Sequence, residues 1–91
     1  MNTYPYTYED EFDWIDEYDD KIDEMRQDLV QFEEQIRLLE RQFQATLDPD
    51  VYIQLSRARR AFWVTADTID FLVMHRRHRL EWQRHSLRGK R

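Results

Sequence analysis

The sequence contains no cysteine, only one glycine and only two prolines among its 91 residues. Without cysteine the chain cannot form disulfide bonds, a thiolate nucleophile or a cysteine-ligated zinc site. The scarcity of glycine and proline leaves few residues suited to the tight turns of a sheet fold, and a charged content of 36% is typical of long helices. A disulfide-stabilised secreted domain and a β-sheet fold are therefore not expected.

Long apolar runs and recognisable catalytic motifs are also missing. No uninterrupted apolar run exceeds four residues, whereas a membrane-spanning helix needs about 20. There is no signal-peptide pattern, glycine-rich phosphate loop or HExxH motif, and no residues are spaced as a nucleophile with its base. His75 and His78 lie three residues apart, but no carboxylate is placed to complete a metal site with them. We expect a cytoplasmic protein that does not associate with membranes, is not an enzyme and binds no metal or cofactor.

The first half of the chain carries an unbroken heptad pattern. Nine apolar or aromatic residues follow one another at alternating intervals of three and four, namely Ile15, Tyr18, Ile22, Met25, Leu29, Phe32, Ile36, Leu39 and Phe43. This spacing predicts one long helix with a single apolar seam, which has to lie against a partner helix. Thr7 followed by Asp10 approximates a capping box. We therefore expect the helix over residues 8–45, after an extended tyrosine-rich arm at residues 1–7.

The segment from Thr46 to Asp50 predicts a short break. Pro49 disfavours helical geometry at the preceding residue and suits the first position of a new helix, which Asp48 would cap. The second helix is expected over residues 49–87, and Gly89 is placed to end it. Residues 8–88 would then form a single domain, with a basic tail at residues 89–91.

Two long helices joined by so short a turn must fold back on each other, so residues whose numbers add to about 95 should face one another. The residues that this rule sets against the first seam are Tyr52, Leu55, Arg59, Phe62, Ala66, Ile69, Val73, Arg76 and Leu80. Seven of these nine are apolar or aromatic. Arg76 is expected to stack its guanidinium on Tyr18. The fold class is therefore all-α, an antiparallel two-helix hairpin with a heptad seam.

The second helix carries more apolar residues than one seam requires, since ten of the fourteen residues from Ala61 to Met74 are apolar. A helix that is apolar over most of its circumference is usually buried on more than one side. We expect the hairpin to assemble through this helix into a four-helix-bundle dimer or a higher oligomer. The expected oligomer interface comprises Ala61, Trp63, Val64, Thr68, Phe71, Leu72 and Met74.

The net charge of −5 is distributed unevenly along the chain. Residues 1–50 carry 16 acidic and 4 basic side chains, a balance of −12, and residues 51–91 carry 3 acidic and 10 basic ones, a balance of +7. The hairpin places the acidic start beside the basic end. Pairing of the two ends within one chain is the favoured interpretation, and the alternative is that one charged face is displayed to a partner.

These features predict a homo-oligomeric protein–protein interaction module. Its length, helical plan and lack of catalytic groups suit a small inhibitor or adaptor of the kind that phages encode, and its acidic first helix is expected to engage another protein, as a mimic of nucleic acid. The residues expected to bind that partner are Tyr4, Tyr6, Tyr8, Asp10, Asp13, Trp14, Glu17 and Asp20.

Two alternative functions follow from the basic residues. In the first, a helical bundle sequesters a small anion such as a nucleotide, gripped by Arg59, Arg76 or Arg77. In the second, the basic end of the second helix, which has seven Arg or Lys among residues 76–91, binds nucleic acid directly. The acidic residues at the same end of the hairpin disfavour the second alternative.

Overall fold

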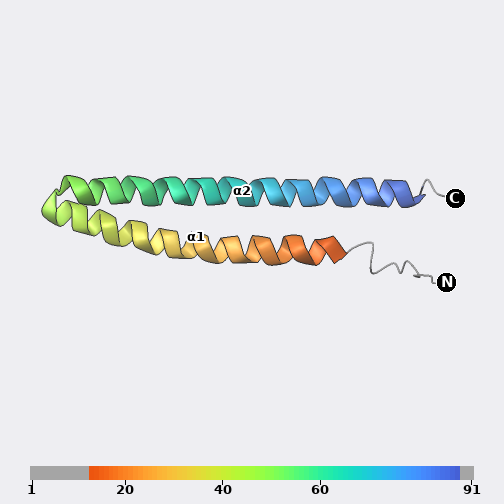
Figure 1. Ribbon diagram of the computed structural model, residues 1–91, viewed down its shortest axis with the longest axis horizontal. Coiled ribbons are helices and arrows are strands. Elements are labelled where there is room, and N and C mark those ends of the chain that lie inside the picture. The colour runs from red at the N-terminus through yellow and green to blue at the C-terminus, as the bar shows by residue number, and fades with distance from the viewer. Residues whose placement is uncertain (1–12, 89–91) are drawn as a thin grey trace, which may run out of the picture.

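The computed structural model describes residues 13–88, which form two helices. Helix α1 (Asp13–Thr46) and helix α2 (Pro49–Arg88) run side by side in opposite directions (Figure 1). The predicted hairpin is confirmed, and the expected helix boundaries at residues 45, 49 and 87 each fall within one residue of those observed. The expected helix start at Tyr8, the arm at 1–7 and the tail at 89–91 lie outside the described residues.

The turn between the helices is built by Thr46, Leu47 and Asp48. Leu47 adopts the left-handed conformation, with φ at 53°, and its amide donates to the Phe43 carbonyl at 2.7 Å. The Asp48 carboxylate accepts the amide of Asp50 at 2.9 Å, which is the N-cap contact expected of Asp48. The reversal therefore costs one residue with an unfavourable φ, and the cap and the Leu47 hydrogen bond offset that cost.

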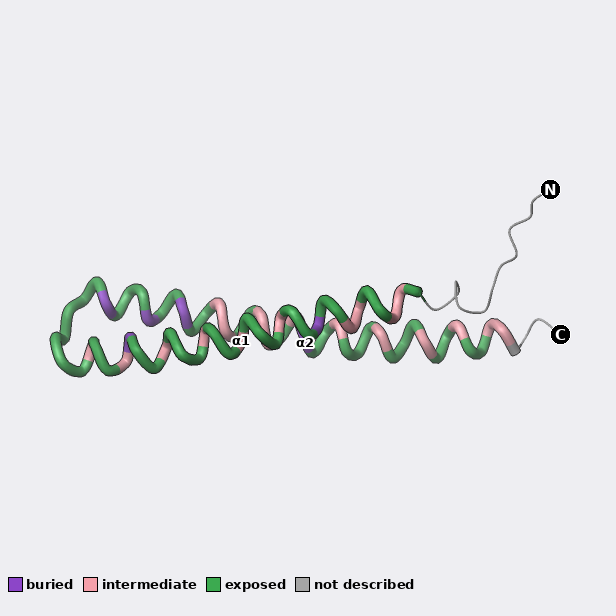
Figure 2. Tube along the Cα trace, turned by 90° about the horizontal axis from the view of Figure 1, so that it is seen from below, coloured by how far each residue is buried: buried purple, intermediate pink, exposed green. Residues whose placement is uncertain are grey.

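The predicted register is confirmed by two contacts far apart along the hairpin. The rings of Phe43 and Tyr52 have centroids 5.4 Å apart near the turn, and Arg76 Nε lies 2.9 Å from Asp19 Oδ1 near the open end. The residue numbers of both pairs add to 95. In Figure 2 the two helices exchange sides about midway along their length, as expected for helices that wind around each other along a heptad seam.

The predicted seam of α2 is wrong by one residue at three positions. Tyr52, Arg59 and Val73 were expected in the seam and are exposed, whereas their neighbours Val51, Ala58 and Leu72 are buried or partly buried. The rule of constant sums fixes the height of a residue along the hairpin but not its direction around the helix. Neighbouring residues differ by only about 1.5 Å in height but by about 100° in direction. The apolar neighbour at each height therefore turns inward.

The hairpin is long and thin, with extents of 69 × 24 × 15 Å. Only one layer of side chains separates two helices, so few residues can be fully enclosed. The buried apolar residues are Ile22, Leu39, Val51, Leu55, Ala58 and Ile69. Four of these six form a cluster near the turn, and partly buried Ile36 and Phe43 pack against it. Figure 2 shows this concentration of buried residues toward the turn.

Candidate interaction surfaces

The side of α2 that faces away from α1 carries an apolar surface. Trp63, Val64, Phe71 and Met74 are exposed to between 58% and 64%. Val64 and Phe71 are seven residues apart and therefore lie on the same side of the helix, two turns from each other. We call the outward side of α2 around these residues the outer stripe. A group of large apolar side chains of this kind in a small protein commonly marks an interface.

The seven residues predicted to form an oligomer interface fall into two groups. Trp63, Val64, Phe71 and Met74 belong to the outer stripe and are exposed, while Ala61, Thr68 and Leu72 are partly buried. The hydroxyl of Thr68 donates to the Val64 carbonyl at 2.8 Å. That hydroxyl can therefore be covered by another molecule without losing its hydrogen bond.

The outward side of α1 is polar by comparison. Its exposed large apolar residues in the described range are Val30 and Leu38, which lie eight residues apart. Single exposed apolar residues are normal on a protein surface. The two helices thus differ, and the surplus of exposed apolar side chains belongs to α2.

Aromatic rings join α1 to α2 near the open end of the hairpin. The Tyr18 hydroxyl lies 2.6 Å from His75 Nδ1, and the two rings are nearly parallel with centroids 5.8 Å apart. His75 in turn stacks on Phe71, with centroids 5.6 Å apart and an interplanar angle of 12°. Phe71 is therefore exposed on one side and held on the other through His75.

Trp14 lies one turn closer to the open end and also contacts α2. Its indole Nε1 donates to Gln83 Oε1 at 2.8 Å, and the Arg79 guanidinium lies over its ring at 4.4 Å from the centroid. The rings of Trp14 and Tyr18 meet edge to face, with centroids 5.4 Å apart, and this contact completes the group. Trp14 was expected to meet a partner protein, but in this structure its ring is engaged by the hairpin itself.

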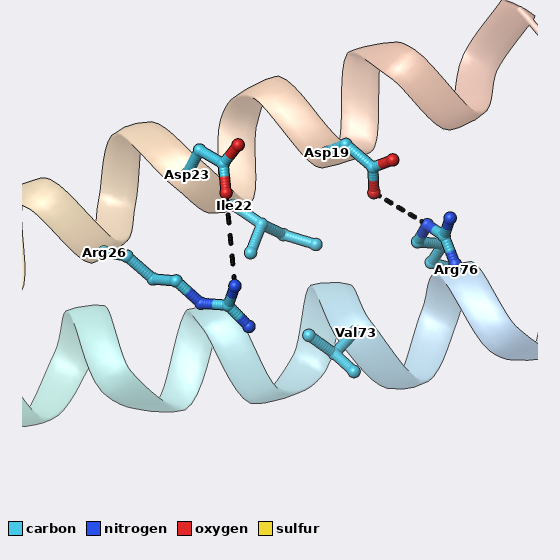
Figure 3. A pocket seen from close by; sticks show the side chains of 6 residues that line it. All are labelled: Asp19, Ile22, Asp23, Arg26, Val73 and Arg76. Carbon is cyan, nitrogen blue, oxygen red and sulfur yellow. Dashed lines mark ion pairs between the residues drawn. The ribbon is translucent and has the colours of Figure 1, made fainter.

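The expected stack of Arg76 on Tyr18 does not form. Arg76 pairs with Asp19 instead, and Figure 3 shows this ion pair beside a second pair between Asp23 and Arg26 on α1. Arg76 Nε is shielded from water and lacks good hydrogen-bond geometry, so its contact with Asp19 is mainly electrostatic. His75 takes the position against Tyr18 because it lies one residue earlier on α2 and so points toward the other flank of the seam.

Most carboxylates at the start of α1 have no ion-pair partner among residues 13–88. Across residues 13–88 the helices are joined by two ion pairs, Asp19 with Arg76 and Glu40 with Arg59. Four other carboxylates near the open end are exposed and have no ion-pair partner among the described residues, namely Asp13, Asp16, Glu17 and Asp20. We call these four the acidic face. The sequence favoured pairing of the acidic start with the basic end within one chain. Among the described residues this pairing is limited to single contacts.

The arginines proposed to hold an anion are not brought together. Arg59 and Arg76 lie 17 residues apart on α2, about 26 Å along the axis, and each is paired with a carboxylate. Arg77 is exposed. A shallow pocket of about 420 Å³ lies beside Arg76, but Asp19 and Asp23 also line it (Figure 3). Carboxylates in the lining disfavour an anion, so this pocket gives no support to a nucleotide site.

The described part of the chain offers neither a cluster of metal ligands nor a membrane-spanning stretch. Among residues 13–88 no three side chains of His, Asp or Glu are gathered so that they could hold a metal ion. Neither α1 nor α2 contains a stretch apolar enough to cross a membrane. The proposed partner-binding residues Tyr4, Tyr6, Tyr8 and Asp10 lie outside the described residues.

Two contacts of the open end were not predicted from the sequence. Gln83 and Arg79 both contact Trp14. The residue numbers of Trp14 and Gln83 add to 97, and those of Trp14 and Arg79 add to 93. Both sums are close to the 95 of the register, so extending the facing pairs beyond the apolar seam would have found them.

Comparison with known proteins gives no further guide to function, because no family model, curated protein or solved structure matches the chain.

Proposed function

We propose that this protein is a non-enzymatic homo-oligomeric interaction module, assembled through α2 and presenting α1 to another protein. One observation carries the first part, namely the exposure of Trp63, Val64, Phe71 and Met74 on a single helix of a small hairpin. Removing such side chains from water stabilises an assembly by about 1.5–3 kcal/mol for each residue that becomes fully buried. The outer side of α1 has no comparable surface among the described residues, so α2 is the helix that associates.

The proposed assembly predicts a mass above that of one chain. At micromolar concentration, sedimentation velocity or light scattering should give at least twice 11.5 kDa, the mass of the single chain. Because the interface is mainly apolar, raising the salt concentration should not dissociate it. A species of 11.5 kDa at these concentrations would contradict the proposal.

The acidic face supports the second part of the proposal. Asp13, Asp16, Glu17 and Asp20 are exposed and lack ion-pair partners within residues 13–88, so their charge is available to a second molecule. Over residues 13–28 there are eight acidic and two basic side chains, spread along about 22 Å of helix. A row of negative charge of this length matches a basic groove, such as one that otherwise holds a nucleic-acid backbone. The proposed partner is therefore a protein with a basic binding surface.

The acidic face can be tested with a fluorescent oligo-arginine peptide as the probe. The triple variant Asp16→Asn, Glu17→Gln, Asp20→Asn should bind it roughly tenfold more weakly at low salt, because three exposed charge pairs at about 0.5 kcal/mol each amount to about 1.5 kcal/mol. A matched control removes three exposed carboxylates outside residues 13–28 and nearer the turn, Glu33→Gln, Glu34→Gln and Asp50→Asn. Equal losses in the two triples would mean that net charge alone attracts the peptide and that the acidic face is not a distinct site.

A further inference from the structure

The outer stripe has a regular spacing that extends beyond its apolar centre. Eight exposed residues of α2 form one row along the outer stripe, namely Ile53, Arg57, Arg60, Val64, Phe71, His75, His78 and Trp82. Trp63 and Met74 lie beside this row, and His75 lies at its edge, where it contacts Tyr18 of α1. Their successive intervals are 4, 3, 4, 7, 4, 3 and 4 residues. The interval of seven spans Asp67 and Thr68, so the stripe continues the three-and-four spacing of a helix seam along the whole of α2.

These intervals read the same in both directions, so two copies of the row can lie antiparallel about a two-fold axis with every member facing another member. Each residue has a counterpart with which its number adds to 135, and the centre falls between Asp67 and Thr68. In an antiparallel pair of α2 helices with this centre, Val64 of one copy faces Phe71 of the other. Ile53 likewise faces Trp82. Apolar residues therefore meet apolar residues at both the middle and the ends of the contact.

The same centre matches the helix as a whole. Helix α2 runs from Pro49 to Arg88, so its midpoint is 68.5, one residue from the centre of the stripe at 67.5. Two copies related by this axis overlap over almost the full length of α2. Both α1 helices then lie on the outside of a four-helix arrangement, with their polar sides toward water.

We propose that the outer stripe binds a second copy of this chain with its α2 antiparallel, on a two-fold axis between Asp67 and Thr68. This inference rests on the proposed function, because it names the partner and the geometry of the same assembly. Phe71 is already held for such a contact by its stack on His75, and Thr68, beside the axis, keeps its hydroxyl bonded to Val64. The centre of the interface can thus close without leaving that hydroxyl unsatisfied.

The charges disfavour the parallel alternative. A parallel pair would set Arg57 against Arg57 and Arg60 against Arg60, whereas the antiparallel pair sets these guanidinium groups against the imidazole rings of His78 and His75, on which they can stack. A parallel pair would also place the two acidic segments at residues 13–28, each with a balance of −6, at the same level. In the antiparallel pair their centres lie about 21 Å apart along the axis. Asp67 lies close to Asp67 of the second chain in both arrangements, so this residue does not distinguish the two.

The absence of cysteine allows single spin labels to measure the arrangement in the full chain. The label is attached at Gln54→Cys in one variant and at Asp70→Cys in another, both on exposed residues. In the antiparallel pair, Gln54 of one chain lies at the level of residue 81 of the other, 27 residues along the axis from the second Gln54. Electron spin resonance should therefore give about 40 Å between the labels. The Asp70 positions differ by five residues in height, and their labels should lie within about 20 Å of each other.

The two labels separate the failure of this inference from that of the proposed function. Short distances at both positions would indicate a parallel pair and overturn the antiparallel arrangement, while the oligomeric module would stand. A long distance at Asp70→Cys would show that another surface makes the contact. The absence of any distance at either position, together with a mass of 11.5 kDa, would overturn both. Circular dichroism of each labelled variant verifies that the hairpin remains folded.

Discussion

Phe71→Asp is expected to dissociate the assembly into single chains. Phe71 is 61% exposed in the isolated hairpin and lies at the centre of the proposed contact. Its replacement removes about 2 kcal/mol of apolar burial from each copy and also brings an unpaired carboxylate into an apolar contact, which adds a further cost. Over two copies the loss exceeds about 4 kcal/mol, which corresponds to a dissociation constant raised at least about a thousandfold. Sedimentation velocity over a concentration series measures this shift.

Val30→Asp on α1 is the matched control for that variant. Val30 is exposed to a similar extent, 57%, and receives the same new charge, but it lies on the side that is proposed to face water. The mass of the Val30→Asp variant in solution should show the same number of chains in the assembly as the unchanged protein. If Val30→Asp dissociated the assembly and Phe71→Asp did not, α1 and not α2 would form the contact. Helicity measured by circular dichroism should be the same in both variants, because each side chain is exposed in the hairpin.

Leu55→Ala is expected to lower the free energy of unfolding by about 2–5 kcal/mol. Leu55 is 3% exposed, the lowest value among the buried apolar residues, and packs in the cluster with Leu39, Val51 and Ala58. With one layer of side chains between two helices, the neighbours cannot easily move to fill the space that is lost. Urea denaturation followed by circular dichroism measures the change, at one fixed protein concentration because association contributes to stability.

The control for Leu55→Ala makes the same substitution at an exposed leucine. Leu38 is 63% exposed on α1, so Leu38→Ala should change the free energy of unfolding by no more than about 0.5 kcal/mol. Equal effects of the two substitutions would show that the cluster near the turn is not the main source of stability.

The hairpin and its register could be predicted because each rests on a strong local signal. Nine seam residues in one unbroken pattern define α1, and Pro49 with Asp48 places the start of α2. A short turn then leaves one way to align two helices of similar length. The contacts of Phe43 with Tyr52 and of Asp19 with Arg76 confirm that alignment at both ends.

The details of the α2 seam could not be predicted in the same way, because α2 has apolar residues on several sides. At the heights of Tyr52 and Arg59 an apolar neighbour was available one residue earlier, and Val51 and Ala58 took the inward positions. Arg59 then reached Glu40 across the outside of the hairpin at 2.9 Å. A rule based on residue numbers alone does not predict which side chain points inward when several neighbouring residues are apolar.

The contacts at the open end depended on competition among several polar and aromatic side chains. Tyr18 had both Arg76 and His75 within two residues of its predicted level, and the sequence favoured the arginine. The carboxylate of Asp19 holds Arg76, which leaves His75 for the tyrosine. The limited pairing of the acidic face has a related cause: residues on the outer flank of α1 point away from α2 and cannot reach its cations.

The concentration of the core near the turn sets the order in which the hairpin forms and opens. The contacts of Leu39 with Val51 and Leu55 close short loops, which lose little chain entropy, while those of Trp14 and Tyr18 with α2 close loops of 57 to 69 residues. We therefore expect folding to start at the turn and fraying to begin at the open end. The acidic face lies on the segment expected to form last and to open first, so the proposed partner would meet the least stable part of α1 while the turn remains closed.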